Sequence, residues 1–127
     1  MFGNSISLGK PLILCVDDSE TQLWLRAQVL EKNGYSVLNA STAAKALHLL
    51  RDNPICLVVS DHMLTETTGT QLAKEMKRIK PHVPVLLYSG AAPEMMGNVD
   101  CFIQKDVSVE RFLATIRDLT KRFSLAH

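Results

Sequence analysis

Five side chains that suit phosphoryl transfer stand just beyond short apolar runs in the sequence. They are the carboxylates of Asp17, Asp18 and Asp61, the hydroxyl of Ser89 and the ammonium of Lys105. A carboxylate can act as a nucleophile and form an acyl phosphate. Lysine and hydroxyl groups can neutralise the charge that develops on a transferred phosphoryl group. The set therefore has the parts of a phosphorylation site, provided that the fold brings them together.

Three carboxylates in one place need a compensating positive charge. At a separation of about 4 Å, two unit charges repel by roughly 4 kcal/mol at an effective dielectric constant near 20. Either some of the carboxylates are protonated or a cation lies among them. Carboxylate oxygens are hard ligands, and Mg²⁺ is commonly held by one or two of them together with phosphate oxygens. We therefore expect Mg²⁺ as the cofactor.

Short apolar runs predict the strands that carry these residues. Three runs are continuous, which favours strands buried on both faces of a parallel sheet, and they cover residues 12–16, 56–59 and 83–88. Two segments are shorter or more mixed in character, at residues 35–40 and 101–103. We interpret these two as the edge strands.

Helical periodicity fills the spaces between the predicted strands. Apolar residues recur at helical spacing at Leu23, Ala27 and Leu30; at Ala43, Ala46, Leu47 and Leu50; at Leu72, Met76 and Ile79; and at Val109, Phe112, Leu113 and Ile116. The sequence from Ser19 to Gln22 predicts a capping box at the start of the first helix. Alternating strands and helices indicate a doubly wound α/β fold. Ligands bind such sheets beyond the carboxyl ends of the strands, where the five candidate side chains stand.

The composition is that of one globular domain, with 46% apolar and 21% charged residues in a chain of 127. We expect an N-terminal extension at residues 1–10, the domain at 11–123 and a short tail at 124–127. The net charge of +1 and the scattered lysines and arginines argue against direct nucleic-acid binding. No apolar run has the length of a membrane span. Three cysteines without a C-x-x-C pair favour a reducing, cytoplasmic location.

Four motifs resemble, in this order, those of the response-regulator receiver family of two-component signalling. They are Val16-Asp17-Asp18-Ser19; Ser60-Asp61-His62-Met63, with Gly69 eight positions after Asp61; Leu87-Tyr88-Ser89-Gly90; and Phe102-Ile103-Gln104-Lys105. The resemblance covers residues 12–122. It implies an α/β, flavodoxin-like, doubly wound fold whose five-stranded parallel sheet has the order 2-1-3-4-5.

The resemblance also implies a role for each site residue. Asp61 is expected to accept the phosphoryl group, and Lys105 is expected to pair with it. The expected Mg²⁺ ligands are the carboxylates of Asp18 and Asp61 and the backbone carbonyl of Met63. Asp17 would act on the ion through a water molecule.

A switch and a set of partners follow from the same resemblance. The hydroxyl of Ser89 is expected to move toward the phosphoryl group while the ring of Phe102 reorients. A histidine kinase or a phosphotransfer protein would donate the phosphoryl group, and a downstream protein of unknown identity would respond. The chain would catalyse only its own phosphorylation and dephosphorylation, so we do not expect an enzyme.

Three departures from the family pattern concern loops. Thr65 and Asp106 stand where the family commonly has proline. A cis peptide bond before a residue other than proline costs about 2.5–4 kcal/mol, so we expect a trans bond between Lys105 and Asp106. Residues 91–99 leave room for about one helical turn, because Pro93 favours a helix start and Gly97 a stop. The sequence therefore predicts a shortened fourth helix and no phosphorylation-driven dimer through it.

Three other functions fit parts of the sequence. A receiver fold that works as a phosphorylation-independent scaffold would not need the complete set of site residues. An aspartyl-phosphate hydrolase of the haloacid-dehalogenase kind would carry Asp-x-Asp after the first strand, where this chain has Asp17-Asp18-Ser19. A flavin-binding flavodoxin-like protein would carry a phosphate-binding loop there, and two carboxylates would repel that phosphate.

Overall fold

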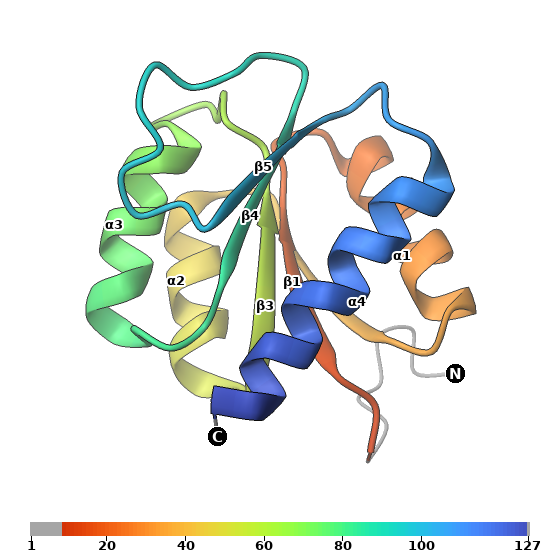
Figure 1. Ribbon diagram of the computed structural model, residues 1–127. Helices are drawn as coiled ribbons and strands as arrows, with labels where there is room; N and C mark the ends of the chain where they lie inside the picture. Colours follow the sequence, from red (N-terminus) through yellow and green to blue (C-terminus); the bar gives the residue numbers. More distant parts are fainter. Residues whose placement is uncertain (1–8, 127) are drawn as a thin grey trace.

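All five strands of the sheet run parallel, in the order β2-β1-β3-β4-β5 (Figure 1). The structure is a computed structural model that describes residues 9–126, with side chains described to residue 123. The strands are β1 (Leu12–Val16), β2 (Ser36–Ala40), β3 (Ile55–Ser60), β4 (Val85–Ser89) and β5 (Cys101–Gln104). The predicted order is confirmed, and the two mixed segments are the edge strands β2 and β5.

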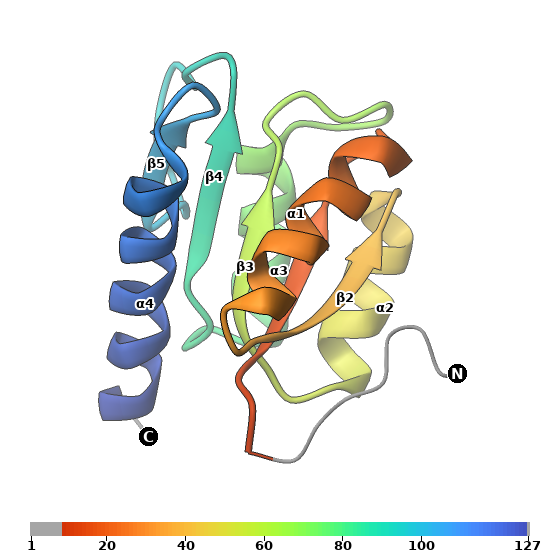
Figure 2. The same ribbon diagram turned by 90° about the vertical axis from the view of Figure 1, so that its right-hand side faces the viewer.

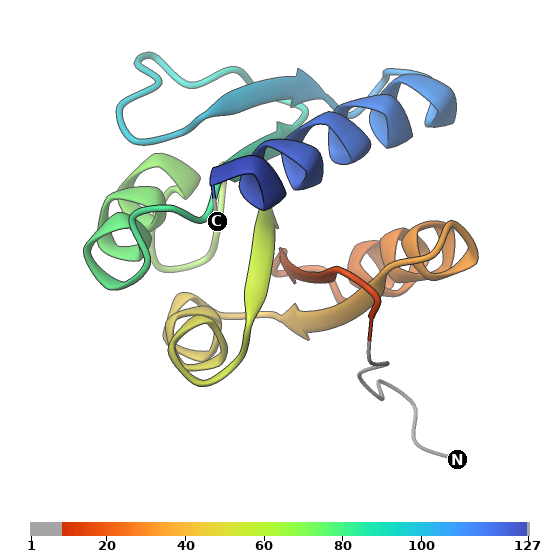
Figure 3. The same ribbon diagram turned by 60° about the horizontal axis from the view of Figure 1, so that its bottom comes forward.

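Helices cover both faces of this sheet, as the continuous apolar runs predicted. They are α1 (Glu20–Lys32), α2 (Ala43–Asp52), α3 (Gly69–Ile79) and α4 (Val109–Ala126). Helices α1 and α4 lie on one face, and α2 and α3 lie on the other (Figures 2 and 3). Because parallel strands need crossover connections, this arrangement leaves all the carboxyl ends of the strands at one edge of the sheet.

The core consists of two apolar clusters, one on each face of the sheet. Alternate residues of β1 divide between them, since successive side chains of a strand point to opposite faces. Leu14 and Val16 belong to the cluster under α2 and α3. Ile13 and Cys15 belong to the cluster under α1 and α4. All four are fully buried, so β1 is held firmly between β2 and β3 just before the position of Asp17 at the carboxyl edge of the sheet.

The first helix begins with half of the predicted capping box. The hydroxyl of Ser19 accepts a hydrogen bond from the backbone N–H of Gln22 at 3.2 Å, as an N-cap does. The backbone N–H of Ser19, however, donates to the carboxylate of Asp17 at 2.9 Å. A carboxylate is a stronger acceptor than the amide of Gln22. The helix start is thereby tied to the strand-end carboxylate.

The predicted shortened fourth helix is replaced by a loop, so the described residues form four helices and not five. Residues 90–100 contain no helix between β4 and β5 (Figure 1). Pro93 has no backbone N–H to donate, and Gly97 adopts a left-handed φ of 53° that interrupts a helix. A single turn forms where the N–H of Val99 donates to the carbonyl of Met96 at 2.9 Å. Val99 is buried in the cluster under α2 and α3, which anchors the loop.

The structure describes only part of the predicted N-terminal extension and of the predicted C-terminal tail. Most of the predicted extension at residues 1–10 lies outside the described residues, as does His127 of the predicted tail. Helix α4 continues to Ala126. None of the described helices is both long enough and apolar enough to cross a membrane.

Candidate functional site

Three carboxylates meet at the carboxyl edge of the sheet. Asp17 and Asp18 follow β1, Asp61 follows β3, and one oxygen from each lies within 4.8 Å of the others. Asp17 is buried, Asp61 is half-buried and Asp18 is exposed. The site is therefore open to solvent on the side of Asp18 and closed on the side of Asp17.

Lys105 brings a positive charge to two of these carboxylates. It follows the edge strand β5, and its Nζ lies 3.1 Å from Oδ2 of Asp17 and 3.4 Å from Oδ2 of Asp61. Its backbone N–H donates to the carbonyl of Ser89 at 3.1 Å, which fixes the start of the side chain beside β4. No peptide bond among the described residues is cis, so the trans bond predicted between Lys105 and Asp106 is confirmed.

The carboxylate of Asp17 is the most heavily contacted of the three. Its Oδ1 accepts the N–H of Ser19, and its Oδ2 accepts from Lys105 and from Nη2 of Arg26 at 3.2 Å. Burial alone raises the pKa of Asp17, but the Ser19 hydrogen bond and the two cations outweigh it and hold the pKa below its ordinary value. Asp17 is therefore ionised in the folded protein at neutral pH.

Asp61 is held on a short, tightly packed loop. Its Oδ1 accepts the N–H of His62 at 2.7 Å, and its own backbone N–H donates to the carbonyl of Val16 at 3.0 Å. Gly69, the first residue of α3, donates to the carbonyl of His62 at 2.6 Å. A Cβ at Gly69 would lie 2.5 Å from the Asp61 carbonyl oxygen and closer still to Leu87. Glycine is therefore required here for α3 to approach the loop.

Thr65 contributes a hydrogen bond that proline could not make. Its hydroxyl donates to Oδ2 of Asp18 at 3.1 Å, across 47 positions of the sequence. The departure from the family pattern at this position therefore has a consequence at the site. Asp18 has a protein donor on one oxygen while the rest of its carboxylate faces solvent.

The two predicted switch residues and Met63 lie outside this hydrogen-bonded cluster. Ser89 is buried at the end of β4, and its hydroxyl accepts the N–H of Ala91 at 3.4 Å. Phe102 is half-buried and packs against the core under α2 and α3. Met63 exposes its side chain, and its backbone forms an isolated bridge with Thr68. Among the described residues, no hydrogen bond joins these side chains to the carboxylates.

The order of strands and this strand-end chemistry together match a known family. The sequence model of one protein family, described as the response regulator receiver domain, matches residues 13–117 of this chain. The chain belongs to this family. Receiver domains act in phosphorylation-based signalling in two-component systems, and most of the chain, including every predicted site residue, lies in the matched range.

Three similar proteins align with most of the chain. The polar-differentiation response regulator DivK of Brucella ovis is 27% identical over 113 residues, which are 83% of this chain and 92% of DivK. The transcriptional regulatory protein GlrR of Escherichia coli is 31% identical over 84% of this chain, a stretch that is 25% of GlrR. A CheY-like receiver domain protein from Methanospirillum hungatei superposes with a TM-score of 0.87 at 25% identity, covering 94% of this chain and all of that one.

The donor set of this receiver domain suits a divalent cation such as Mg²⁺. Receiver domains typically bind Mg²⁺ at an acidic pocket, and here three carboxylate oxygens lie within 4.8 Å of one another. Carboxylates and carbonyls are the hard oxygen ligands that this ion prefers. Asp18, the exposed member, has the coordination space that an incoming ion needs.

Arg26 is a site residue that the sequence did not reveal as one. It lies on α1, is buried, and contacts Asp17 directly. The sequence did contain one indication of this role. Arg26 stands three positions after Leu23 and four before Leu30, and this spacing puts it on the apolar side of the helix, which faces the sheet. A charged residue on that side is almost never buried without a partner.

Proposed function

We propose that this receiver domain is a phosphorylation-dependent switch whose acceptor is Asp61. A histidine kinase or a phosphotransfer protein donates the phosphoryl group, and the phosphorylated form changes its binding to a downstream protein. The observation that carries the proposal is the position of Lys105, whose ammonium lies within hydrogen-bond reach of both Asp61 and Asp17. A cation at this point can pair with a phosphoryl group on Asp61.

The proposed transfer uses groups that are already in place. An oxygen of Asp61 attacks the phosphorus of a phosphohistidine, the P–N bond breaks, and the imidazole leaves with the electron pair. Oδ1 of Asp61 is held by the N–H of His62, while Oδ2 faces Lys105. Attack by Oδ2 would form the new P–O bond beside the ammonium, which then pairs with the phosphoryl oxygens.

We propose Asp18, Asp61 and the carbonyl of Met63 as the residues that hold Mg²⁺, with Asp17 acting through a water molecule. The bound ion would neutralise charge on the phosphoryl oxygens. Attack of water on the acyl phosphate would later release phosphate and restore Asp61. The chemistry of the chain is then limited to its own phosphorylation and dephosphorylation, which fits a signalling protein of the reducing cytoplasm.

The switch would begin at Ser89. Its hydroxyl accepts only a long hydrogen bond of 3.4 Å from Ala91, near the limit for such bonds, so little is lost when it moves. We propose that it donates to a phosphoryl oxygen on Asp61 and that the ring of Phe102 changes position in response. Phe102 is only half-buried, which leaves it room to move.

The direct test is incubation with acetyl phosphate, with and without Mg²⁺, followed by intact-mass measurement. The expected result is the gain of one phosphoryl group that depends on Mg²⁺. A phosphorylation-independent scaffold would gain none under either condition, and that result would overturn the proposal. Incubation with a phosphorylated histidine phosphotransfer protein then tests the proposed donor class separately.

A further inference from the structure

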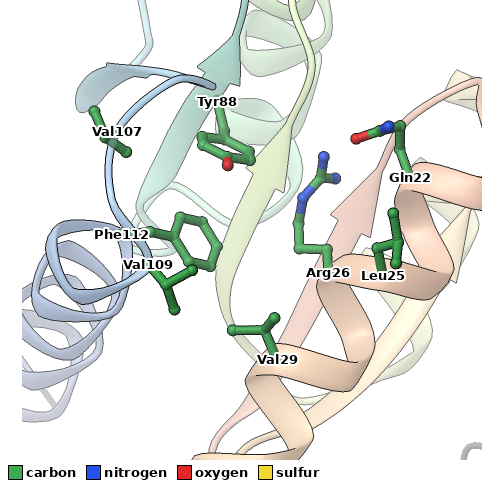
Figure 4. Close-up of a pocket in the computed structure, with 8 residues that line it drawn as sticks. All are labelled: Gln22, Leu25, Arg26, Val29, Tyr88, Val107, Val109 and Phe112. Carbon is green, nitrogen blue, oxygen red and sulfur yellow. The ribbon is translucent and has the colours of Figure 1, made fainter.

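Arg26 is a buried arginine whose guanidinium lies between the carboxylate of Asp17 and the ring of Tyr88. The side chains of Arg26 and Asp17 are only 4% and 2% exposed. The guanidinium carbon lies 5.0 Å from the centre of the Tyr88 ring. Figure 4 shows this guanidinium extending from α1 between Tyr88 and Gln22, at one side of a groove of about 130 Å³ that Phe112 also lines.

Stability alone explains this buried pair poorly. Nε and Nη1 of Arg26 are shielded from solvent and have no hydrogen-bond partner among the described residues. A buried donor without a partner costs free energy. Replacing a buried ion pair by apolar residues of similar volume often leaves a protein equally stable or more stable. The charge of Arg26 is therefore better explained by the site that it faces.

Arg26 contacts the same oxygen that Lys105 contacts. Both donate to Oδ2 of Asp17, and the N–H of Ser19 donates to Oδ1, so both oxygens of Asp17 are held by protein groups. Asp17 can turn toward a cation or its bound water only by giving up part of these contacts. Lys105 also contacts Asp61, whereas the only ion pair of Arg26 among the described residues is with Asp17.

Arg26 also changes the charge that an incoming cation meets. With Arg26 and Lys105 in place, the three carboxylates keep one uncompensated negative charge. Without Arg26 they would keep two. Because Arg26 and Asp17 are buried, solvent screens this difference less than it would screen charges at the surface.

We propose that Arg26 is a positioning residue that competes with the divalent cation for Asp17 and thereby keeps the affinity of the site for Mg²⁺ low. Arg26 holds the carboxylate of Asp17 in place before the ion arrives. When the ion binds, the ion pair between Arg26 and Asp17 weakens. The inference rests on the proposed function, because it takes Mg²⁺ as the ligand of the carboxylates.

Isothermal titration calorimetry with Mg²⁺ tests the competition. Arg26→Met, which keeps the length and removes the charge, is expected to bind Mg²⁺ about tenfold more tightly than the wild type. Arg26→Lys keeps the charge and is expected to remain within about threefold of the wild type. The matched control Arg117→Met removes an exposed charge from α4, and solvent screening should leave its affinity within about threefold of the wild type.

A measurement on the wild type covers the case in which Arg26→Met fails to fold. The Nη2 amino group of Arg26, which donates to Asp17, can be followed by NMR during a Mg²⁺ titration, with Arg26→Lys used to assign the signal. Its hydrogen exchange is expected to become faster as the site saturates, because the guanidinium is released from Asp17. Unchanged exchange at saturation would overturn the inference.

The outcomes separate this inference from the proposed function. If Arg26→Met binds Mg²⁺ with the same affinity as the wild type, or more weakly, the inference is overturned. The proposed phosphorylation site would not be affected by that result. No binding by any folded variant would overturn both.

Discussion

The ammonium of Lys105 lies 3.4 Å from Oδ2 of Asp61, although 44 positions separate the two residues in the sequence. β4 lies between the strands that carry them, and the backbone of Lys105 is fixed to its last residue, Ser89. The side chain therefore reaches across β4 toward the centre of the site. The same ammonium contacts Asp17, so one cation links the carboxylates of two strands.

Lys105→Met should slow phosphorylation of the protein strongly. Loss of one group that stabilises the charge on reacting oxygens costs about a hundredfold in rate or more. The rate of phosphoryl gain from acetyl phosphate can be followed by intact mass at saturating Mg²⁺. Lys121→Met, an exposed lysine on α4, is the matched control and should react at the wild-type rate. If both variants keep that rate, Lys105 has no part in the transfer.

Gly69→Ala should damage both stability and the site. The new Cβ would collide with the backbone carbonyl of Asp61 and with the end of the Leu87 side chain, and the carbonyl cannot move without shifting the loop that follows β3. Overpacking of this kind costs about 1–3 kcal/mol. Thermal unfolding measures the loss, and acetyl phosphate labelling measures the displacement of Asp61. Gly90→Ala is the control, because a Cβ there meets nothing within 4 Å. Equal melting temperatures for the two variants would contradict this account of Gly69.

Asp18→Asn should stabilise the metal-free protein and weaken its binding of Mg²⁺. The change removes one of three neighbouring negative charges and leaves Thr65 an oxygen to bond. Because Asp18 is exposed and partly screened, the gain should be about 1 kcal/mol. Thermal scans with and without Mg²⁺ measure both effects. Clear destabilisation of the metal-free protein together with unchanged Mg²⁺ affinity would rule out a clustered site.

The strand-end residues could be predicted from the sequence because two simple rules suffice. A continuous apolar run marks a buried parallel strand, and parallel strands end at one edge. These rules are enough to bring Asp17, Asp61 and Ser89 to the same edge of the sheet. Lys105 joins them because the shorter, mixed segment before it was interpreted as an edge strand of the same sheet. The rules also place the edge strands correctly, since edge strands are covered less completely and tolerate mixed composition.

The contacts of Arg26 and Thr65 could not be predicted in this way. Whether the head group of Arg26 reaches Asp17 or solvent depends on the rotation of α1 against β1, which no periodicity specifies. The hydrogen bond of Thr65 depends on how the loop after Asp61 folds back over Asp18. In residues 90–100, Pro93 and Gly97 correctly indicated an interrupted helix. Their combined effect on so short a segment was larger than predicted, and no helix forms.

Phosphorylation should not make this protein dimerise through a helix between β4 and β5. The surface that such a helix would present is a loop in this chain, held by Val99 in the core and by Asp100, which pairs with Lys77 at 2.7 Å. Light scattering with and without beryllofluoride, a mimic of the phosphoryl group, should give the same molar mass. A beryllofluoride-dependent symmetric dimer with residues 90–100 helical at its interface would contradict this reading of the loop.

Locating the phosphoryl group after treatment with acetyl phosphate and Mg²⁺ tests directly whether Asp61 is the acceptor. Borohydride reduces an aspartyl phosphate to homoserine, which peptide mass spectrometry detects at a single position. Homoserine is expected at position 61 in the wild type and in the control Asp118→Asn, which changes an exposed carboxylate on α4. No phosphoryl gain is expected in Asp61→Asn. Equal labelling of Asp61→Asn, or homoserine at a position other than 61 in the wild type, would contradict the assignment of Asp61 as the acceptor.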